Sequence, residues 1–212
     1  MSNTSSFAFL NAPAPEARRE NDPLTETSIG ENVLVNTPFI KAVEEKVRLP
    51  DGQESRRFCI RHSGAAAIIA LDEDGTILLE RQWRHPLKRS FWELPAGKLD
   101  PNETEEHCAR RELLEECGVS AGRWTRLGEL HNAIGYSDER LVIYLAEELS
   151  CGEQRLDDGE HLEVYRIDWH EALEMCHDGR ITDVKTIVGL FWLERFLSQE
   201  EHSDGYRLGN GD

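Results

Sequence analysis

One segment limits the fold more than any other: residues 65–71 read Ala-Ala-Ala-Ile-Ile-Ala-Leu, with no polar interruption. A strand that is apolar at every position must be covered on both faces, whereas a strand with one wet face alternates apolar and polar residues. A turn sequence follows at residues 72–75 (DEDG), and residues 76–79 resume as a partner strand. We therefore expect a sheet that lies between two covering layers.

The rest of the central pattern mixes short strands with helices. Residues 103–117 are rich in Glu, Ala, Leu and Arg, which favour a helix, with Asn102 or Thr104 as its N-cap and Gly118 just after its end. Further strands are predicted at residues 124–131, 141–146 and 163–167, and further helices at residues 170–177 and 183–197. This order predicts an α+β fold, with a mixed central sheet between helices.

The two ends of the chain lack this pattern. Residues 1–30 contain prolines and show no regular spacing of apolar residues, so we expect a flexible N-terminal arm. An alternation of apolar and polar residues, typical of a strand, begins at Phe39, and a turn follows at residues 50–52 (PDG). Residues 57–61 then read as a second strand, so the segment is predicted to form a hairpin. The predicted division is an arm over residues 1–30, an N-terminal β-hairpin subdomain over 31–62, the main domain over 63–200 and a frayed tail over 201–212.

Charge and cysteine usage exclude several classes of protein. Lys and Arg number 24 against 41 Asp and Glu, a net charge of −17, which argues against a general nucleic-acid binder and against docking on an anionic membrane. The N-terminus has no basic segment before an apolar run, and no stretch reaches the roughly 20 apolar residues of a membrane span, so we expect a cytoplasmic protein. The five cysteines include no CxxC pair, which favours reduced thiols over a disulfide framework or a zinc ribbon.

Three glutamates in the predicted helix carry the strongest chemical signal. Glu112, Glu115 and Glu116 stand at i, i+3 and i+4 and therefore share one helix face. Their mutual repulsion is relieved by a hard divalent cation, and Arg111 can pair with a carboxylate to hold it in place. Magnesium is usually bound by one or two carboxylates together with substrate phosphates, so the cluster points to phosphate chemistry. The alternative interpretation is a solvated acidic helix face.

The spacing around these glutamates decides between the two interpretations. Gly97, Glu103, Arg111-Glu112, Glu115-Glu116, Gly118 and the apolar Val119 resemble the Nudix box at every defined position. The resemblance implies a Nudix-type α/β/α sandwich and metal-dependent hydrolysis of a pyrophosphate linkage, with Mg²⁺ as the cofactor and Mn²⁺ as a substitute. It also implies these roles: Glu112 and Glu116 as main metal ligands, Glu115 as an auxiliary ligand, the carbonyl of Ala96 as a further ligand, Arg111 orienting the glutamates, Gly97 permitting a tight loop, and Glu103 bracing that loop against the helix.

Other segments are similar to the ADP-ribose pyrophosphatase branch of this family. They are residues 80–86 (ERQWRHP), 92–98 (WELPAGK), 135–139 (GYSDE) and 159–164 (GEHLEV), and the match covers about residues 35–197. The resemblance implies cleavage of ADP-ribose to AMP and ribose 5-phosphate. Arg84 would contact the pyrophosphate, Glu93 the terminal ribose, and Gly135 would belong to the substrate-binding loop. The alternatives are a surface salt bridge for Arg84 and an exposed strand position for Glu93.

A loop carboxylate outside the helix is expected to position or deprotonate the attacking water. Glu160 fits this role best, and Asp158 is its competitor. One departure concerns the sugar: this branch often has a proline about fifteen residues after the box, where this chain has Ile134. Trp83 is interpreted either as a core residue or as a stacking partner for adenine.

The resemblance also implies a homodimer, in which N-terminal strands cross to the partner and help to bind the nucleoside; the predicted hairpin at residues 39–61 would be the exchanged element. Two rival functions remain. The first is hydrolysis of another nucleotide-sugar or dinucleotide, such as GDP-mannose, NADH or FAD. The second is a Nudix-fold regulator that binds a nucleotide without cutting it.

Overall fold

The computed structural model describes residues 22–208, with side chains through residue 199, so most of the predicted arm lies outside the described residues. Its elements, in chain order, are β1 (Thr27–Asn36), β2 (Lys41–Arg48), β3 (Glu54–Arg61), β4 (Ala65–Ala70), β5 (Thr76–Arg84), the 3₁₀ turn η1 (His85–Leu87), β6 (Arg89–Glu93), β7 (Ala96–Lys98), α1 (Glu105–Cys117), β8 (Val119–Leu130), β9 (Leu141–Cys151), β10 (Leu162–Asp168), α2 (Trp169–His177) and α3 (Val184–Leu208).

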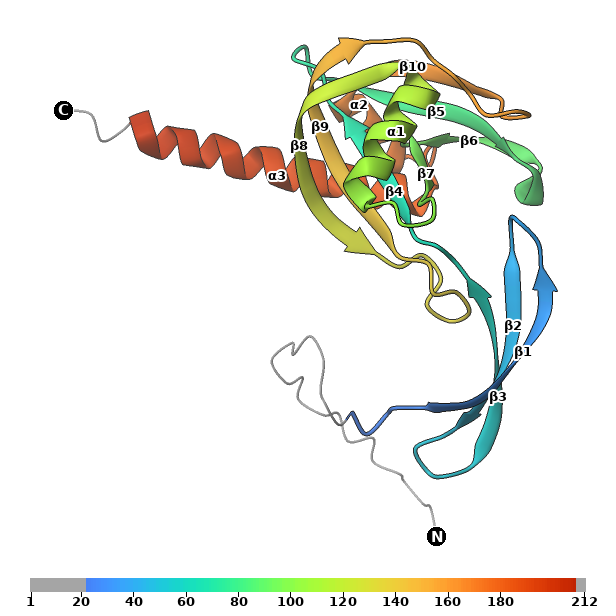
Figure 1. Cartoon of the computed structure of the whole chain (residues 1–212). Helices are drawn as coiled ribbons and strands as arrows, with labels where there is room; N and C mark the ends of the chain where they lie inside the picture. The colour runs from blue at the N-terminus through green and yellow to red at the C-terminus, as the bar shows by residue number, and fades with distance from the viewer. Residues whose placement is uncertain (1–21, 209–212) are drawn as a thin grey trace.

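The main domain is built on two sheets covered by helices. One sheet has the order β7-β4-β9-β8 and is mixed, because β4 runs parallel to β9 while the other pairs are antiparallel. The other sheet, β10-β5-β6, is antiparallel. Helix α1 packs on one side of the mixed sheet, and α2 and α3 pack on the other (Figure 1). The predicted α+β sandwich with a mixed sheet is confirmed.

Strand β4 explains why the sandwich has two cores. Its alternate residues Ala66 and Ile68 pack with the α1 side, together with Leu113. The intervening Ala67 and Ile69 pack toward α2 and α3. Every residue of β4 is at most 6% exposed, as expected for a strand with no polar position. The unbroken apolar run therefore becomes the wall between two hydrophobic cores.

The N-terminal region differs from the predicted two-stranded hairpin. It is a three-stranded antiparallel sheet of order β1-β2-β3, which Figure 1 shows beside the main domain. The predicted boundary at residue 30 falls inside β1. Two register shifts, at residues 28–30 and 33–35, interrupt the pairing of β1 with β2. Such irregularities break the period of two by which a strand is recognised in a sequence, so β1 was missed.

The C-terminal boundary also differs. Helix α3 continues to Leu208, beyond the predicted end at residue 197, so residues 201–208 of the predicted frayed tail are helical. The added turns (SQEEHSDGYRL) lack the apolar spacing that marked the first part of the helix. Among the described residues, no helix is both long and apolar enough to cross a membrane.

Candidate active site

Helix α1 presents the predicted glutamates, and its ends show why it begins and stops where it does. Thr104, rather than Asn102, is the N-cap: its side-chain oxygen accepts a hydrogen bond from the His107 N–H at 3.3 Å. Gly118 takes the left-handed conformation at φ 64° and ends the helix through a hydrogen bond from its N–H to the Leu114 carbonyl at 2.9 Å.

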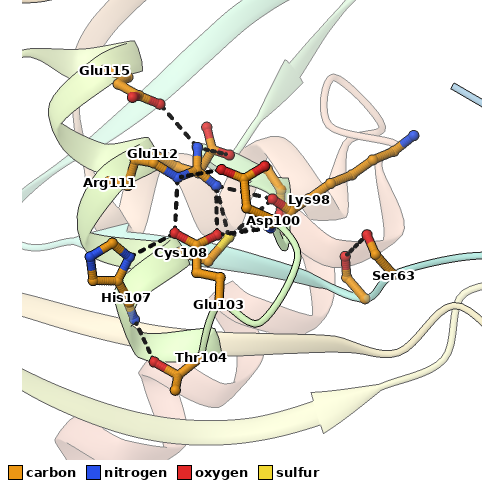
Figure 2. Close-up of polar contacts among 12 residues, drawn as sticks. Ser63, Lys98, Asp100, Glu103, Thr104, His107, Cys108, Arg111, Glu112 and Glu115 are labelled. Carbon is orange, nitrogen blue, oxygen red and sulfur yellow. Dashed lines mark hydrogen bonds and ion pairs between the residues drawn. The ribbon is translucent and has the colours of Figure 1, made fainter. Parts of the chain in front are cut away.

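Glu103 fastens the loop before α1, as the box resemblance implied. Its carboxylate accepts hydrogen bonds from the Asp100 N–H at 3.0 Å and from both Nε and Nη2 of Arg111 at 3.0 and 2.9 Å. These contacts are drawn in Figure 2. Arg111, the backbone bond from Asp100 and the contact with His107 together lower the pKa of Glu103 to about 2, although its burial acts in the opposite direction. The loop is therefore tied to the helix by an ionised carboxylate.

Arg111 also contacts the box glutamates. Its Nη1 donates to Glu112 at 2.7 Å and to Glu115 at 3.0 Å, while Nη2 reaches the Lys98 carbonyl at 3.0 Å (Figure 2). One guanidinium thus joins the loop, the brace residue and two glutamates. Its planar fork of donors suits this task, because it serves several oxygens in fixed directions.

Gly97 lies directly against Glu112. A Cβ placed on Gly97 would overlap the Glu112 carboxylate, so only glycine leaves that carboxylate in its present place. The next residue toward the N-terminus, Ala96, donates its N–H to Glu116 at 2.9 Å. The box loop is therefore in contact with two of the three helix glutamates.

The structure adds a carboxylate that the sequence analysis missed. Glu80 of β5 is 3% exposed and Glu116 is 4% exposed, and the two are close enough to influence each other's ionisation. Burial raises the pKa of both, and the charges of Glu80, Glu112 and Glu160 raise that of Glu116 further. Burial also raises the pKa of Glu112 to about 7. The sequence signals for Glu80 were its place directly after the apolar residues 77–79 and its place at the start of the similar segment 80–86, neither of which gave it a role.

The carboxylates of Glu80, Glu112 and Glu116 are oxygen ligands of the kind that a hard cation prefers, although they do not surround one common point. Within residues 22–208, no three acidic, histidine or cysteine side chains converge closely enough to ligate an ion. One oxygen of Glu112 faces Arg111, and one of Glu116 faces the Ala96 N–H. The donor set nevertheless consists only of oxygens, and a cation would relieve the repulsion that ionisation of these buried carboxylates creates. We conclude that the residues fit a divalent metal ion.

Glu160 extends this cluster from the loop before β10. Gln82 of β5 donates to its carboxylate at 3.3 Å, and its negative charge raises the pKa of both Glu112 and Glu116. The loop carboxylate that the sequence analysis preferred therefore lies near enough to Glu112 and Glu116 to influence their ionisation.

Arg84 and Glu93 form a bidentate ion pair beside the cluster. Arg84 Nε and Nη2 donate to the two oxygens of Glu93 at 2.6 and 2.7 Å. Glu93 is 4% exposed, so its interpretation as an exposed strand residue is wrong. Two residues that the sequence analysis did not assign complete the group: Lys185 Nζ donates to Glu93 at 2.5 Å and to Asp183 at 3.0 Å. Their only sequence signal was a polar cap before an apolar helix.

An open pocket of about 330 Å³ lies beside these groups, although none of the box-helix glutamates is among the residues that line it. Its lining includes Arg84, Glu93, Ala96 and Lys185, with Asn132 and Glu139 from the loop before β9. Gly135 of that loop is not part of the lining, and neither is Ile134, which is 84% exposed. Trp83 is 55% exposed, so its interpretation as a core residue is wrong.

Comparisons with known proteins agree with this geometry. The NUDIX domain model matches residues 61–187. The chain is 35% identical over 173 residues to the ADP-ribose pyrophosphatase of Bacillus subtilis (strain 168), covering 81% of this chain and 94% of that protein. It is 34% identical to the methanol dehydrogenase activator of Bacillus methanolicus, covering 80% and 92% of the two chains. It is also 34% identical to the GDP-mannose pyrophosphatase of Yersinia pestis (strain Pestoides F), covering 64% and 73%.

A solved structure supports the fold independently. The crystal structure of an ADP compounds hydrolase superimposes with a TM-score of 0.74 over 85% of this chain and 98% of that chain, at 20% sequence identity. Most of the chain thus shares both a sequence pattern and an architecture with these proteins. The matched domain includes the box helix, the glycine loop and the pocket described above. This chain belongs to the Nudix family and is a Nudix pyrophosphatase.

Proposed function

We propose that the protein is a metal-dependent pyrophosphohydrolase that cleaves ADP-ribose to AMP and ribose 5-phosphate. The observation that carries the proposal is that two groups lie beside one pocket: the box-helix glutamates, which contact the lining residues Ala96 and Gly97, and the Arg84–Glu93 pair, which lines the pocket itself. The first group suits metal-assisted chemistry at phosphorus, and the second suits recognition of a pyrophosphate and a sugar. The name of the Bacillus subtilis relative supports the same substrate.

The proposed cofactor is Mg²⁺, with Mn²⁺ as a substitute. Glu112, Glu116 and the Ala96 carbonyl would hold the metal, with Glu115 as an auxiliary ligand. When bound, the ion would neutralise the pyrophosphate, polarise phosphorus and make the attacking water more acidic. Nudix hydrolases generally need a divalent metal, and the oxygen-only donor set of this site fits one.

The remaining roles belong to residues around the metal ligands. Arg111 orients Glu112 and Glu115 through the contacts described above. Glu160 serves as the base that takes a proton from the attacking water; the effect of its charge on the pKa of Glu112 and Glu116 supports this role. Arg84 binds the pyrophosphate, and Glu93 accepts hydrogen bonds from the terminal ribose. We keep Gly135 as a residue of the substrate-binding loop.

A substrate panel tests this function. We expect purified protein with Mg²⁺ to give its highest kcat/KM on ADP-ribose, ahead of GDP-mannose, NADH, FAD and a dinucleoside polyphosphate, in a phosphate-coupled assay. A higher kcat/KM on GDP-mannose would overturn the ADP-ribose assignment and favour the activity named for the Yersinia relative. Nucleotide binding without any turnover would favour a regulatory role, and a relative named as an activator makes that outcome worth testing.

We also propose that a second copy of this chain covers β1. All ten residues of β1 are exposed, including Val33 and Val35 at 48% and 46%, and β2 pairs with only one of its edges. Exposed apolar strands of this kind are usually covered by a partner. The N-terminal sheet also reaches the site, because the ammonium group of Lys98 lies 3.9 Å from the centre of the Phe39 ring. A partner on this sheet would therefore border the pocket.

Light scattering during gel filtration checks the dimer. We expect twice the chain mass for the natural protein and a monomer for Val33→Glu/Val35→Glu, because two carboxylates would be buried without cationic partners at the interface. Ile134→Glu adds a charge at another exposed apolar residue and should leave the dimer intact. A monomeric natural protein at micromolar concentration would contradict the proposal.

A further inference from the structure

Glu93 is neutralised from two sides by cations that differ in accessibility. The Arg84 side chain is 45% exposed, whereas those of Glu93 and Lys185 are 5% and 10% exposed. Arg84 and Lys185 both donate to the Oε2 atom of Glu93, at 2.7 and 2.5 Å. Arg84 also lies near enough to Glu116 for that charge to raise its pKa. The more accessible cation therefore contacts Glu93 and also lies near the box glutamate Glu116.

Lys185 is held in place by the start of α3. Asp183 accepts hydrogen bonds from Lys185 Nζ, from the Thr186 N–H at 3.1 Å and from the Thr186 hydroxyl at 2.7 Å. The same Thr186 hydroxyl accepts a hydrogen bond from the Leu94 N–H at 2.9 Å, and Thr186 is completely buried. Leu94 follows Glu93 directly, and Thr186 follows Lys185. The hydrogen bond from the Leu94 N–H to the Thr186 hydroxyl therefore holds the segments that carry Glu93 and Lys185 side by side.

The charges of the four side chains in this ion-paired group explain what Lys185 does. Glu93 and Asp183 carry two negative charges, and Arg84 and Lys185 carry two positive charges. If Arg84 turned to a substrate phosphate, Lys185 would still donate to both carboxylates. Without Lys185, the same movement would leave two largely buried carboxylates with no cation, which is strongly unfavourable. Although burial by itself raises the pKa of Glu93, the bonds from Arg84 and Lys185 hold it below its usual value.

We propose that Lys185 is a positioning residue that releases Arg84 for the substrate: by neutralising Glu93 permanently, it allows Arg84 to exchange the carboxylate for a pyrophosphate oxygen. This inference rests on the proposed function, because it takes Arg84 as the pyrophosphate ligand. It assigns a role to the Asp183-x-Lys185-Thr186 segment, which lies outside the Nudix box. Lys185 itself need not touch the substrate.

Binding of imidodiphosphate, a non-hydrolysable pyrophosphate, with Mg²⁺ tests the proposal by calorimetry. In Lys185→Met, Glu93 has only Arg84 as a cation, so we expect Kd to rise about tenfold, equal to about 1.4 kcal/mol. KM for ADP-ribose should rise by a similar factor, with kcat changed less than about threefold. Lys185→Arg should restore most of the affinity. Arg195→Met removes the same charge from an exposed position on α3 and should leave Kd unchanged.

A double variant separates positioning from a simple loss of stability. Glu93→Gln/Lys185→Met removes one charge of each sign, so no charge is left at position 93, and Asp183 keeps its two hydrogen bonds from Thr186. The fold should therefore survive even if Lys185→Met alone does not. We expect Lys185→Met to change the Kd for imidodiphosphate less than about twofold in the Glu93→Gln background, because Arg84 is no longer held by a carboxylate. An equal loss in both backgrounds, or none in the natural one, would overturn the proposal.

The two hypotheses fail in different ways. If the natural protein binds imidodiphosphate but does not cleave ADP-ribose, the substrate assignment is wrong and the variants still test Lys185. If ADP-ribose is cleaved and Lys185→Met binds imidodiphosphate normally, the role of Lys185 is wrong and the proposed function stands. If the natural protein fails to bind imidodiphosphate, Arg84 is not a pyrophosphate ligand, and the Lys185 proposal falls with that role.

Discussion

Glu116→Gln should lower kcat about 10³-fold, because a divalent ion contributes several kcal/mol to such reactions and each 1.36 kcal/mol is a factor of ten in rate. The melting temperature without metal should stay within about 2 °C of that of the natural protein. Glu116 is buried beside Glu80 and Glu112, so its neutral form is favoured when no metal is present. Glutamine has nearly the same shape as the neutral acid, and the Ala96 N–H keeps an oxygen acceptor in the variant.

Melting curves with and without Mg²⁺ give a second measurement on the same variant. Metal that binds only the folded state raises its melting temperature, and we expect this rise to be much smaller in Glu116→Gln. Glu106→Gln is the matched control, because Glu106 lies on the same helix with a side chain that is 52% exposed and pairs with Arg110. Undiminished kcat in Glu116→Gln would remove Glu116 from the metal site.

The second large effect is expected for Gly97→Ala. The added methyl group would overlap the Glu112 carboxylate, which must then move away from its place in the cluster. We expect kcat to fall about 10²-fold, because small displacements of positioned groups have effects of this size. Because the atoms that the methyl group meets are the end of a flexible side chain, they can move aside, and the free energy of unfolding should fall by less than about 1 kcal/mol, which is less than about 4 °C in melting temperature.

Gly135→Ala is the matched control for the stability measurement. A Cβ on Gly135 meets nothing within 4 Å, and neither Gly97 nor Gly135 has a positive φ. Both substitutions therefore lower the conformational entropy of the unfolded chain by a similar amount. They differ in the contact that the added methyl group makes in the folded protein. Normal kcat and KM in Gly135→Ala would also argue against a role for Gly135 in substrate binding. If Gly97→Ala kept full activity, the close approach of β7 to Glu112 would not matter for catalysis.

Local patterns in the sequence were enough to predict the centre of the fold. The apolar residues 65–71 required a strand covered on both faces, and the helix formers between Thr104 and Gly118 set the helix that carries the box glutamates. Both signals come from residues close together in the chain, where a period or a cap can be read directly. The spacing of the box also led to the family, which the comparisons confirm.

Contacts between distant segments were beyond the reach of such patterns. The sequence did not reveal that Glu80 of β5 would be buried beside Glu116, or that Lys185 would pair with Glu93 across 92 positions of the chain. Strand β1 was missed because register shifts break its alternation. A strand or helix sets which of its side chains share a face, and that much is visible in the sequence. Only the packing of one element against another decides which faces meet, and here that packing decided how the charges around Glu93 and Glu116 are balanced.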